Sequence, residues 1–373
     1  MAKCFIEESG LPACVIRRTK GSDDFIGKIT ETFRRAKENA PAIVLLDDLD
    51  KFANEDDHHR DAAEYVAVQA GIDDVKGAEV FVLATVNDRR RLPDSLTRPG
   101  RFDRVFEVQY PTAEDAEKII AHYLKDRKIG ADLDMSDVVR MISHSSCAAL
   151  ESVLNDAAMS AAYARKACIE REDLVRAVLR REYDSPDDLT KMSSERIAKT
   201  ALHEAGHLVA NEVLCAGSVG LASIRSTGRS AAGGFVHRCK RLPRRAYCIV
   251  VALAGKAAVE LYYSETVASG CQSDIKNAYT EIREAISESG TNGFGMIDVA
   301  MHRFPETSES MNARNEAVAQ AELARYYLKA KDVLLQNRAF LEKAAAALAE
   351  KETLLYSDIQ KLRAEVGVTA VAV

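Results

Sequence analysis

The first 110 residues alternate between short apolar runs and amphipathic stretches. Residues 42–50 (AIVLLDDLD) and 80–88 (VFVLATVND) are continuous apolar runs that end in polar and acidic residues, a pattern typical of strands buried on both faces of a parallel sheet. The predicted strands cover residues 12–18, 42–50, 80–88 and 104–109, and the predicted helices cover residues 2–10, 24–41 and 59–75. Strands that alternate with helices predict an α/β core with a parallel sheet.

Beyond Tyr110-Pro111 the pattern changes to helical periodicity alone. Residues 112–182 predict a small bundle of helices, and the polar stretch 181–188 (REYDSPDD) predicts a linker. From about residue 190 the chain is Ala-rich and predicts mainly helices, with one β-rich stretch at 221–238 that contains glycine turns. The three predicted C-terminal helices cover residues 312–335, 337–350 and 355–366.

Composition excludes several classes of protein. The 373 residues suffice for two or three domains. The formal net charge of −6 argues against a nucleic-acid binder, and eight cysteines without a C-x-x-C pair indicate reduced thiols in a cytosolic setting. The first residues contain no apolar signal core. The longest apolar run, 247–263, is interrupted by Gly255, Lys256 and Glu260, so we expect a buried helix in a soluble chain and not a membrane span, which needs ~20 nearly uncharged residues.

Residues 200–210, TALHEAGHLVA, place two histidines and a glutamate inside an apolar run. On a helix, His203 and His207 lie on one face and can hold one metal ion from the same side. This is the H-E-x-x-H arrangement, in which zinc lowers the pKa of a bound water to ~7 and Glu204, as general base, takes its proton. The motif arises by chance on the order of once per hundred such chains, so by itself it favours zinc over a core helix that carries two histidines.

A catalytic zinc ion needs a third protein ligand. Asp274, in ASGCQSDIKNAYTEI, follows a turn at Ser269-Gly270 and is predicted near the start of a helix. An acid at that position is also a common helix-start residue. Cys271 is a rival ligand three residues earlier, and the residues alone leave both candidates open.

Polar residues follow two of the predicted strands in the first 110 residues. Asp47 could hold Mg²⁺ through water, and Asp48 could polarise an attacking water. Asn87 ends the next strand, where its side chain could orient that water. Arg98 and Arg101 lie on a Pro-Gly turn (LTRPGRFDR), from which arginines can reach the nucleotide of a neighbouring subunit. In this order and at these spacings, these five residues predict the part of an ATPase motor that surrounds the nucleotide, which we call the nucleotide side.

These segments resemble the FtsH family of AAA+ zinc metalloproteases, hexameric membrane-anchored machines that unfold and degrade proteins. The resemblance covers essentially the whole chain and rests on RPGRFDR, HEAGH and SG…SDI. It implies an AAA+ large subdomain at residues 1–110, a helical lid at 111–183 and a mainly helical zinc peptidase domain at 187–373. It also implies that Asp274, and not Cys271, is the third zinc ligand.

The resemblance also places a substrate-gripping pore loop in the first part of the chain. Phe25, Ile26 and Gly27 match the family's aromatic pore loop. Without the family, Phe25 is explained equally well as a core residue at the start of a helix.

The chain departs from the family on the nucleotide side. The family's Gly-rich phosphate loop, which ends Gly-Lys-Thr, has no counterpart, and Met1 aligns just beyond it. Asp47-Asp48 stands where the family has Asp-Glu, and SSCAAL (145–150) stands where it has Ser-Gly-Ala-Asp-Leu. The resemblance implies ATP and Mg²⁺ as cofactors. Because of these departures, we expect that the 373-residue chain neither binds nor hydrolyses ATP measurably, whereas the zinc side is intact. We expect membrane association only through a segment that would precede Met1.

Two functions from different classes fit the sequence. The first is an FtsH-like zinc endopeptidase that degrades unfolded proteins as a homo-oligomer, a hexamer by resemblance, in the cytoplasm or at the inner face of the membrane. The second is a non-hydrolysing, ring-forming adaptor of the same fold. The intact His203, Glu204, His207 and Asp274 favour the first. The basic stretch 238–245 (RCKRLPRR) predicts a solvated loop and no nucleic-acid partner.

Overall fold

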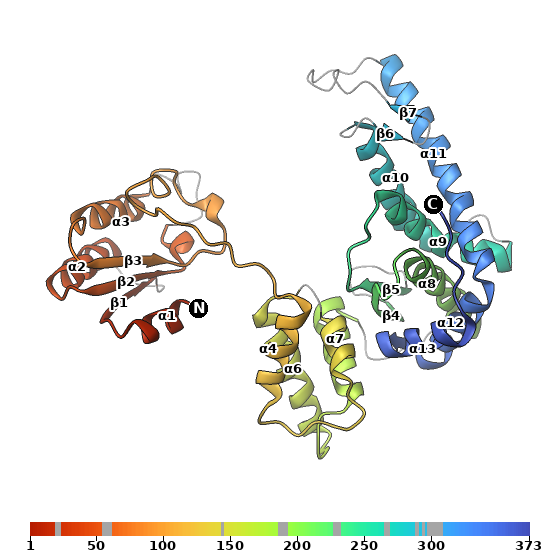
Figure 1. Cartoon of the computed structure of the whole chain (residues 1–373), viewed down its shortest axis with the longest axis horizontal. Coiled ribbons are helices and arrows are strands. Elements are labelled where there is room, and N and C mark those ends of the chain that lie inside the picture. Colours follow the sequence, from red (N-terminus) through yellow and green to blue (C-terminus); the bar gives the residue numbers. More distant parts are fainter. Residues whose placement is uncertain are drawn as a thin grey trace. The chain divides into compact units, whose positions relative to one another are not determined.

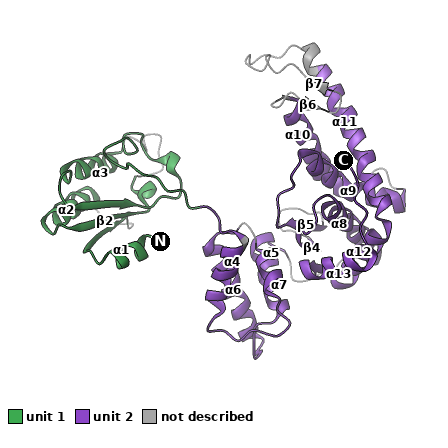
Figure 2. Ribbon diagram, in the orientation of Figure 1, with its two compact units in different colours: residues 1–108 green, residues 109–373 purple. Residues whose placement is uncertain are grey.

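The computed structural model describes ten stretches of the chain and divides it into two compact units. The described residues are 1–18, 24–53, 62–142, 145–185, 193–226, 233–264, 269–287, 291–292, 295–296 and 309–373. The units are residues 1–108 and 109–373 (Figures 1 and 2). The linker predicted at 181–188 lies partly outside the described residues.

The first unit contains a three-stranded parallel sheet, which confirms the predicted α/β core. Its strands are β1 (Ala13–Arg17), β2 (Ala42–Asp47) and β3 (Val80–Ala84), and its helices are α1 (Ala2–Ser9), α2 (Phe25–Glu38) and α3 (Ala63–Asp74). The strand β2 is central, so Val44 pairs with Cys14 on one side and Val82 on the other. α1 ends at Gly10, as predicted, in the left-handed conformation with φ 66°.

One face of this sheet forms the core of the unit. Ile16, Val44 and Leu46 share that face because they alternate along their strands, and they pack with Phe33 and Tyr65 of the helices. Fully burying each such side chain contributes about 1.5–3 kcal/mol. The carboxyl ends of the strands are thereby fixed at one edge of the sheet, where Asp47 ends β2.

The strand predicted at 104–109 is wrong. Residues 103–110 form no strand, and Phe106 is 81% exposed. A strand needs a neighbour to pair its backbone groups, and within the described residues the sheet ends at β3. Within the described residues, this alternating segment therefore has no neighbouring strand with which its backbone can pair.

Residues 113–183 form the predicted helical bundle. Its helices are α4 (Ala113–Leu124), α5 (Met135–Met141), α6 (Cys147–Tyr163) and α7 (Arg171–Tyr183). Thr112, Asp134 and Ser146 cap the first three, each accepting a hydrogen bond from a backbone N–H of the first turn. We call this bundle the lid.

The remainder of the second unit is mainly helical, as predicted. Its helices are α8 (Ser194–Leu214), α9 (Arg245–Tyr263), α10 (Gln272–Ser287), α11 (Glu309–Gln336), α12 (Arg338–Lys351) and α13 (Tyr356–Val366). α8 and α9 approach closely at Gly206, where an added Cβ would lie 2.5 Å from the carbonyl oxygen of Ala254. The small side chain thus sets the distance between the two helices that flank the site.

A small antiparallel sheet lies against these helices. β4 (Val219–Ser226) pairs with β5 (Gly233–Arg238) on one side and with β8 (Thr353–Leu355) on the other. The sequence predicted a β-rich stretch at 221–238, and its residues 227–232 lie outside the described residues. It did not predict β8, nor the two-residue strands β6 (Thr291–Asn292) and β7 (Gly295–Met296), because such short segments carry no readable periodicity.

The lid packs directly on the peptidase part, within one compact unit. The backbone N–H and hydroxyl of Ser357 donate to Asp137 of the lid at 2.8 and 2.7 Å. The ring of Tyr183, the last residue of α7, stacks on Phe235 of β5 with centroids 4.0 Å apart. The last lid helix is therefore in contact with the strand that borders the candidate site.

By length and composition, α9 is apolar enough to cross a membrane. Core helices of globular domains meet the same two criteria. Here Val250, Leu253, Ala254 and Ala257 are buried in the core of the peptidase part, which agrees with the predicted buried helix.

Candidate metal centre

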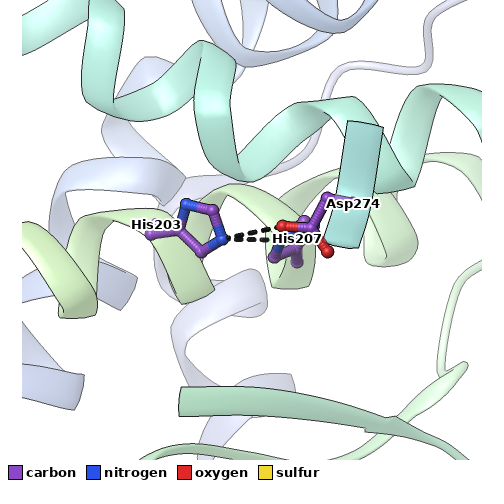
Figure 3. Close-up of side chains that lie close together, drawn as sticks. All are labelled: His203, His207 and Asp274. Atoms are coloured by element: carbon purple, nitrogen blue, oxygen red, sulfur yellow. Dashed lines mark hydrogen bonds and ion pairs between the residues drawn. The ribbon is translucent and has the colours of Figure 1, made fainter. Parts of the chain in front are cut away.

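Three predicted ligands come together on two helices. His203 and His207 lie one turn apart on α8, and Asp274 lies in the first turn of α10 (Figure 3). Asp274 Oδ2 is 3.1 Å from His203 Nε2 and 3.5 Å from His207 Nε2, and the two Nε2 atoms are 3.1 Å apart. One ligand atom from each residue lies within 4.8 Å of the others, a spacing at which three atoms can share one ion.

The orientation of His207 is fixed from outside the cluster. Its Nδ1 donates to the carbonyl oxygen of Val251 in α9 at 2.7 Å. The opposite nitrogen, Nε2, then presents its lone pair toward the other ligands. Such an outer hydrogen bond is the usual way in which a ligand histidine is held in the correct tautomer.

Gly255 provides the space that a metal ion requires. A Cβ at this position of α9 would lie 2.4 Å from His207 Nε2 and 2.7 Å from His203 Nε2. Any larger residue would therefore occupy the volume next to both ligand nitrogens. Two imidazoles and one carboxylate are also a donor set that zinc accepts in catalytic sites, so the residues present fit a zinc ion.

The cluster includes Asp274 and not Cys271. Within the described residues, the group of possible ligands is His203, His207 and Asp274. Cys271 lies in the short helical turn before α10 and is only 3% exposed. Burial raises the pKa of its thiol, which disfavours the thiolate form that binds metal.

Glu204 is buried beside the cluster. Its side chain lies on α8 between the two histidines in sequence and is 4% exposed as a residue. Burial raises its pKa to about 8, although the nearby His207 acts in the opposite direction. A carboxyl group whose pKa lies near neutrality is suited to accept and release a proton at working pH.

A second glycine lets a strand approach this carboxyl group. Gly234 of β5 has φ +97°, and an added Cβ would lie 2.4 Å from Glu204 Oε1. Only glycine adopts this backbone conformation without strain and leaves room for the carboxylate. The strand β5 therefore runs directly past the candidate general base.

Burial and charge shift the other pKa values in the cluster. Burial lowers the pKa of His203. For His207, burial is outweighed by the hydrogen bond and charge of Asp274 and by the charge of Glu204, which raise the pKa to about 9. The pKa of Asp274 is lowered despite burial because both histidines bond to it. Without a cation, the charged His207 imidazole is therefore paired with the Asp274 carboxylate, and a divalent cation held here would displace the His207 proton.

A cavity of about 340 Å³ opens at these residues. It is lined by His203, Glu204, His207, Asn211, Gly233, Gly234, Phe235, Val236, Arg238, Cys248, Val251, Ala252, Gly270, Ser273, Asp274, Asn277 and Glu281. Most of the walls come from α8, α9, α10 and β5, so the cavity borders both the candidate ligands and the candidate base. The roles of Gly234, Gly255 and Val251 were not predicted from the sequence. The two glycines could have indicated a special role, because glycine is disfavoured inside helices and strands.

The predicted nucleotide-side residues also lie at one edge, in the first unit. Asp48 follows β2, and its carboxylate contacts Asn87 Nδ2 at 3.3 Å, Lys51 Nζ at 3.1 Å and Arg17 Nη2 at 3.2 Å. The hydrogen bond from Lys51 is the main cause of its lowered pKa. Asp47 accepts from the Thr85 hydroxyl at 2.8 Å, so this edge of the sheet holds both acids in place.

The two predicted arginines differ in their surroundings. Arg98 is exposed. Arg101 is held within the unit by Asp73 at 2.9 Å and by the carbonyl oxygen of Ser95 at 2.8 Å. Arg101 therefore stabilises the Pro-Gly turn. Arg98 is the arginine of the pair that faces solvent.

The predicted pore-loop residues lie at the start of α2. Phe25 is 6% exposed and packs edge-to-face on Phe52, with centroids 5.0 Å apart. This burial favours the core interpretation of Phe25. Ile26 is 42% exposed, and the N–H of Gly27 donates to the capping Asp24 at 2.8 Å.

Two family models match the chain. Residues 1–110 match the ATPase family associated with various cellular activities (AAA), and residues 190–362 match peptidase family M41. The first match contains the parallel sheet, and the second contains the candidate metal centre and its cavity.

Several curated proteins are similar over nearly the whole chain. The ATP-dependent zinc metalloprotease FtsH of Caldicellulosiruptor bescii is 28% identical over 97% of this chain and 63% of its own length. FtsH 1 of Thermomicrobium roseum is 28% identical over 97% of the chain and 60% of its length. FtsH 2 of Phytoplasma mali is 25% identical over 97% of the chain and 55% of its own length. The chain thus spans about three fifths of the length of these relatives.

Proposed function

We propose that this chain, which belongs to the FtsH family of AAA zinc metalloproteases, is a zinc-dependent endopeptidase that cleaves unfolded polypeptides. One observation carries the proposal: His203, His207 and Asp274 converge within 4.8 Å of one another next to a buried glutamate. The zinc-metalloprotease names of the relatives and the peptidase M41 match add support from outside the site.

His203, His207 and Asp274 would hold the ion. When bound there, zinc supplies a Lewis acid that polarises a peptide carbonyl and acidifies water. Val251 keeps His207 in the ligating tautomer through its 2.7 Å hydrogen bond. Gly255 keeps the space between α9 and the ligands open.

Glu204 would move the proton. Its pKa of about 8 refers to the buried carboxyl without a cation, and a cation nearby would favour the carboxylate form. The carboxylate accepts a proton from the attacking water and then donates it to the departing amine. Because β5 passes beside Glu204, a substrate in extended conformation can place its scissile bond at the base.

The AAA match implies ATP and Mg²⁺ binding, against the expectation drawn from the missing phosphate loop, so for the first unit we propose the nucleotide-side roles that the sequence suggested. Asp47 would bind Mg²⁺ through water, Asp48 would polarise the attacking water and Asn87 would orient it. The 3.3 Å contact between Asn87 and Asp48 supports a shared task. Arg98 is exposed and would reach the nucleotide of the next subunit in a homo-hexamer, while Ile26 would contact translocated substrate. The cytoplasmic face of a membrane is the proposed place of action.

The adaptor hypothesis is not favoured. An adaptor needs the ring-forming fold but has no need for a glutamate buried beside three convergent ligands, nor for glycines that clear space for a metal ion and a strand. These features cost stability and are explained by peptidase chemistry.

The proposal is tested by metal content and proteolysis together. The purified chain should contain one zinc ion per protomer and digest casein, and His207→Ala should abolish both. Cys271→Ser is the matched control and should retain the zinc, because Cys271 is outside the ligand group. Full zinc content in His207→Ala, or loss of zinc in Cys271→Ser, would show that the ligand set is wrong.

A further inference from the structure

The cavity extends from the metal centre along three helices in one direction. Asn211 follows His207 by one turn on α8, and Asn277 follows Asp274 on α10. α9 runs opposite to α8, since Val251 bonds to His207 and Ala254 faces Gly206. Cys248, one turn before Val251, therefore lies on the Asn211 side of the cavity. We call the residues Asn211, Arg238, Cys248, Asn277 and Glu281 the distal end of the cavity.

Asn211 carries an unmatched hydrogen-bond acceptor at this end. The residue is 2% exposed, and its amide nitrogen donates to the carbonyl oxygen of His207 at 2.8 Å. Its Oδ1 is buried and accepts no hydrogen bond from the described part of the chain. A buried acceptor without a donor is costly in a folded protein and calls for an explanation.

The orientation of this amide is determined by its surroundings. Exchanging the oxygen and the nitrogen would place Oδ1 against the His207 carbonyl oxygen, so that two acceptors would face each other. The orientation with one satisfied donor and one free acceptor is therefore the better of the two. A hydrogen-bond donor supplied by a bound molecule would complete it.

The other residues of the distal end limit which substrate side chains can supply that donor. Arg238 is exposed at the end of β5, and its positive charge disfavours lysine or arginine side chains. Glu281 is engaged by Arg245 at 3.7 Å. An acidic side chain has no donor for Asn211. A neutral carboxamide remains, which can donate to Asn211 Oδ1 and also accept from Arg238 or Asn277.

Length favours glutamine over shorter neutral donors. Asn211 lies four positions beyond His207 on the helix, which corresponds to about 6 Å along the axis. A serine hydroxyl is too short to span that distance from a substrate backbone held at the metal, whereas a glutamine side chain extends several ångströms.

We propose that the distal end of the cavity is a specificity subsite for a glutamine-type carboxamide side chain next to the cleaved bond, with Asn211 Oδ1 as its acceptor. The inference rests on the proposed peptidase function and adds a substrate preference to it. Asn211 here is a binding residue and takes no part in the proton transfer.

The test uses two short peptide hydroxamic acids and the zinc-loaded chain. They differ only in the side chain next to the hydroxamate, which is carboxamidoethyl in one and isobutyl in the other. Calorimetry gives the ratio of their dissociation constants for the wild type, Asn211→Leu and Asn211→Ala. Zinc content and thermal unfolding establish that each variant is folded.

The wild type should bind the carboxamide compound more tightly than the isobutyl compound. The ratio of the two dissociation constants should differ by roughly 10-fold between the wild type and Asn211→Leu, which is the effect of one hydrogen bond in a buried site. Asn211→Ala also removes the acceptor and should lose the preference in the same way, so it serves as the test if Asn211→Leu does not fold. A ratio that is the same within twofold in all three proteins overturns the subsite.

Cleavage of a matched pair of peptides separates this inference from the proposed function. The peptides carry glutamine or leucine directly after the scissile bond. If the ratio of the two cleavage rates, glutamine peptide over leucine peptide, is the same for the wild type and Asn211→Leu, the subsite is overturned and the peptidase function stands. A hydroxamate preference without cleavage of either peptide would support the subsite and contradict the peptidase function.

Discussion

Replacing Gly255 with alanine should close the metal centre without damaging the fold. The added Cβ would lie 2.4 Å from His207 Nε2, 2.6 Å from His203 Cε1 and 2.7 Å from His203 Nε2. Unbonded carbon and nitrogen atoms prefer about 3.5 Å or more, so each imidazole must move by about 1 Å. His207 resists this movement because Val251 holds its Nδ1.

The size of the effect follows from that geometry. Displacing ligand-orienting groups typically costs 10–100-fold in metal affinity, so we expect zinc binding to weaken by about that factor. The gain of about 1 kcal/mol for alanine over glycine in a helix interior offsets part of the cost of moving the imidazoles, so the fold should lose less stability than in Gly206→Ala, whose added Cβ meets a backbone carbonyl. A variant that stays folded and unfolds at a higher temperature than Gly206→Ala, but binds zinc more weakly than the wild type, would match this account.

The assay is zinc competition against a chelating dye, with two alanine controls. Gly270→Ala has open space around the added Cβ although Gly270 lines the cavity, and it should bind zinc like the wild type. Gly206→Ala would press on Ala254 at 2.5 Å, and should mainly lower stability. Unchanged zinc affinity in Gly255→Ala would refute the reasoning that this glycine makes room for the ion.

Two further predictions concern the second unit. Glu260 bonds to Lys331 at 2.8 Å and to Lys256 at 3.0 Å, and the Lys331 bond is the main cause of its pKa of about 2. Because the folded pKa is lowered, Glu260 stabilises the fold above about pH 4.5 and loses that contribution as pH falls toward 2. Urea unfolding of wild type and Glu260→Gln should differ by at most about 3 kcal/mol at pH 6 and converge near pH 2, and a constant difference would contradict this. Tyr183→Ala should lower both stability and peptidase rate because it removes the stack on Phe235, whereas Tyr183→Phe should stay near wild type in thermal unfolding and casein digestion; equal losses in both would show that the ring contact is not the cause.

Much of the fold follows from periodicity. The strands β2 and β3 and the helices α2 and α9 lie where apolar patterns placed them. β2 is buried as predicted, but β3 was predicted as a buried strand and instead ends the described sheet, with Phe81 52% exposed. The segment 104–109 carries the same kind of pattern but forms no strand. Strand formation depends on a neighbour, which local sequence does not contain.

The candidate site was only partly readable in the sequence. His203, Glu204 and His207 stand in one helical motif, so their spacing specifies their geometry. Asp274 is 67 residues beyond His207, and its approach depends on how α10 packs on α9. Gly255 acts through a contact between helices, and no local pattern records such a contact. Phe25 shows the opposite case, since an aromatic residue at a helix start fits both a pore loop and a core, and only its burial distinguishes the two.

The most direct test of the central claim is the digestion of casein by zinc-loaded wild type and Glu204→Gln. The amide keeps the size of the side chain and all three proposed zinc ligands, but it cannot accept the proton of the attacking water. We predict an equal zinc content and a rate lowered by ~10²–10⁴-fold, the usual contribution of a general base. A zinc-loaded Glu204→Gln that digests casein at nearly the wild-type rate would contradict the assignment of Glu204 as the base of a zinc peptidase.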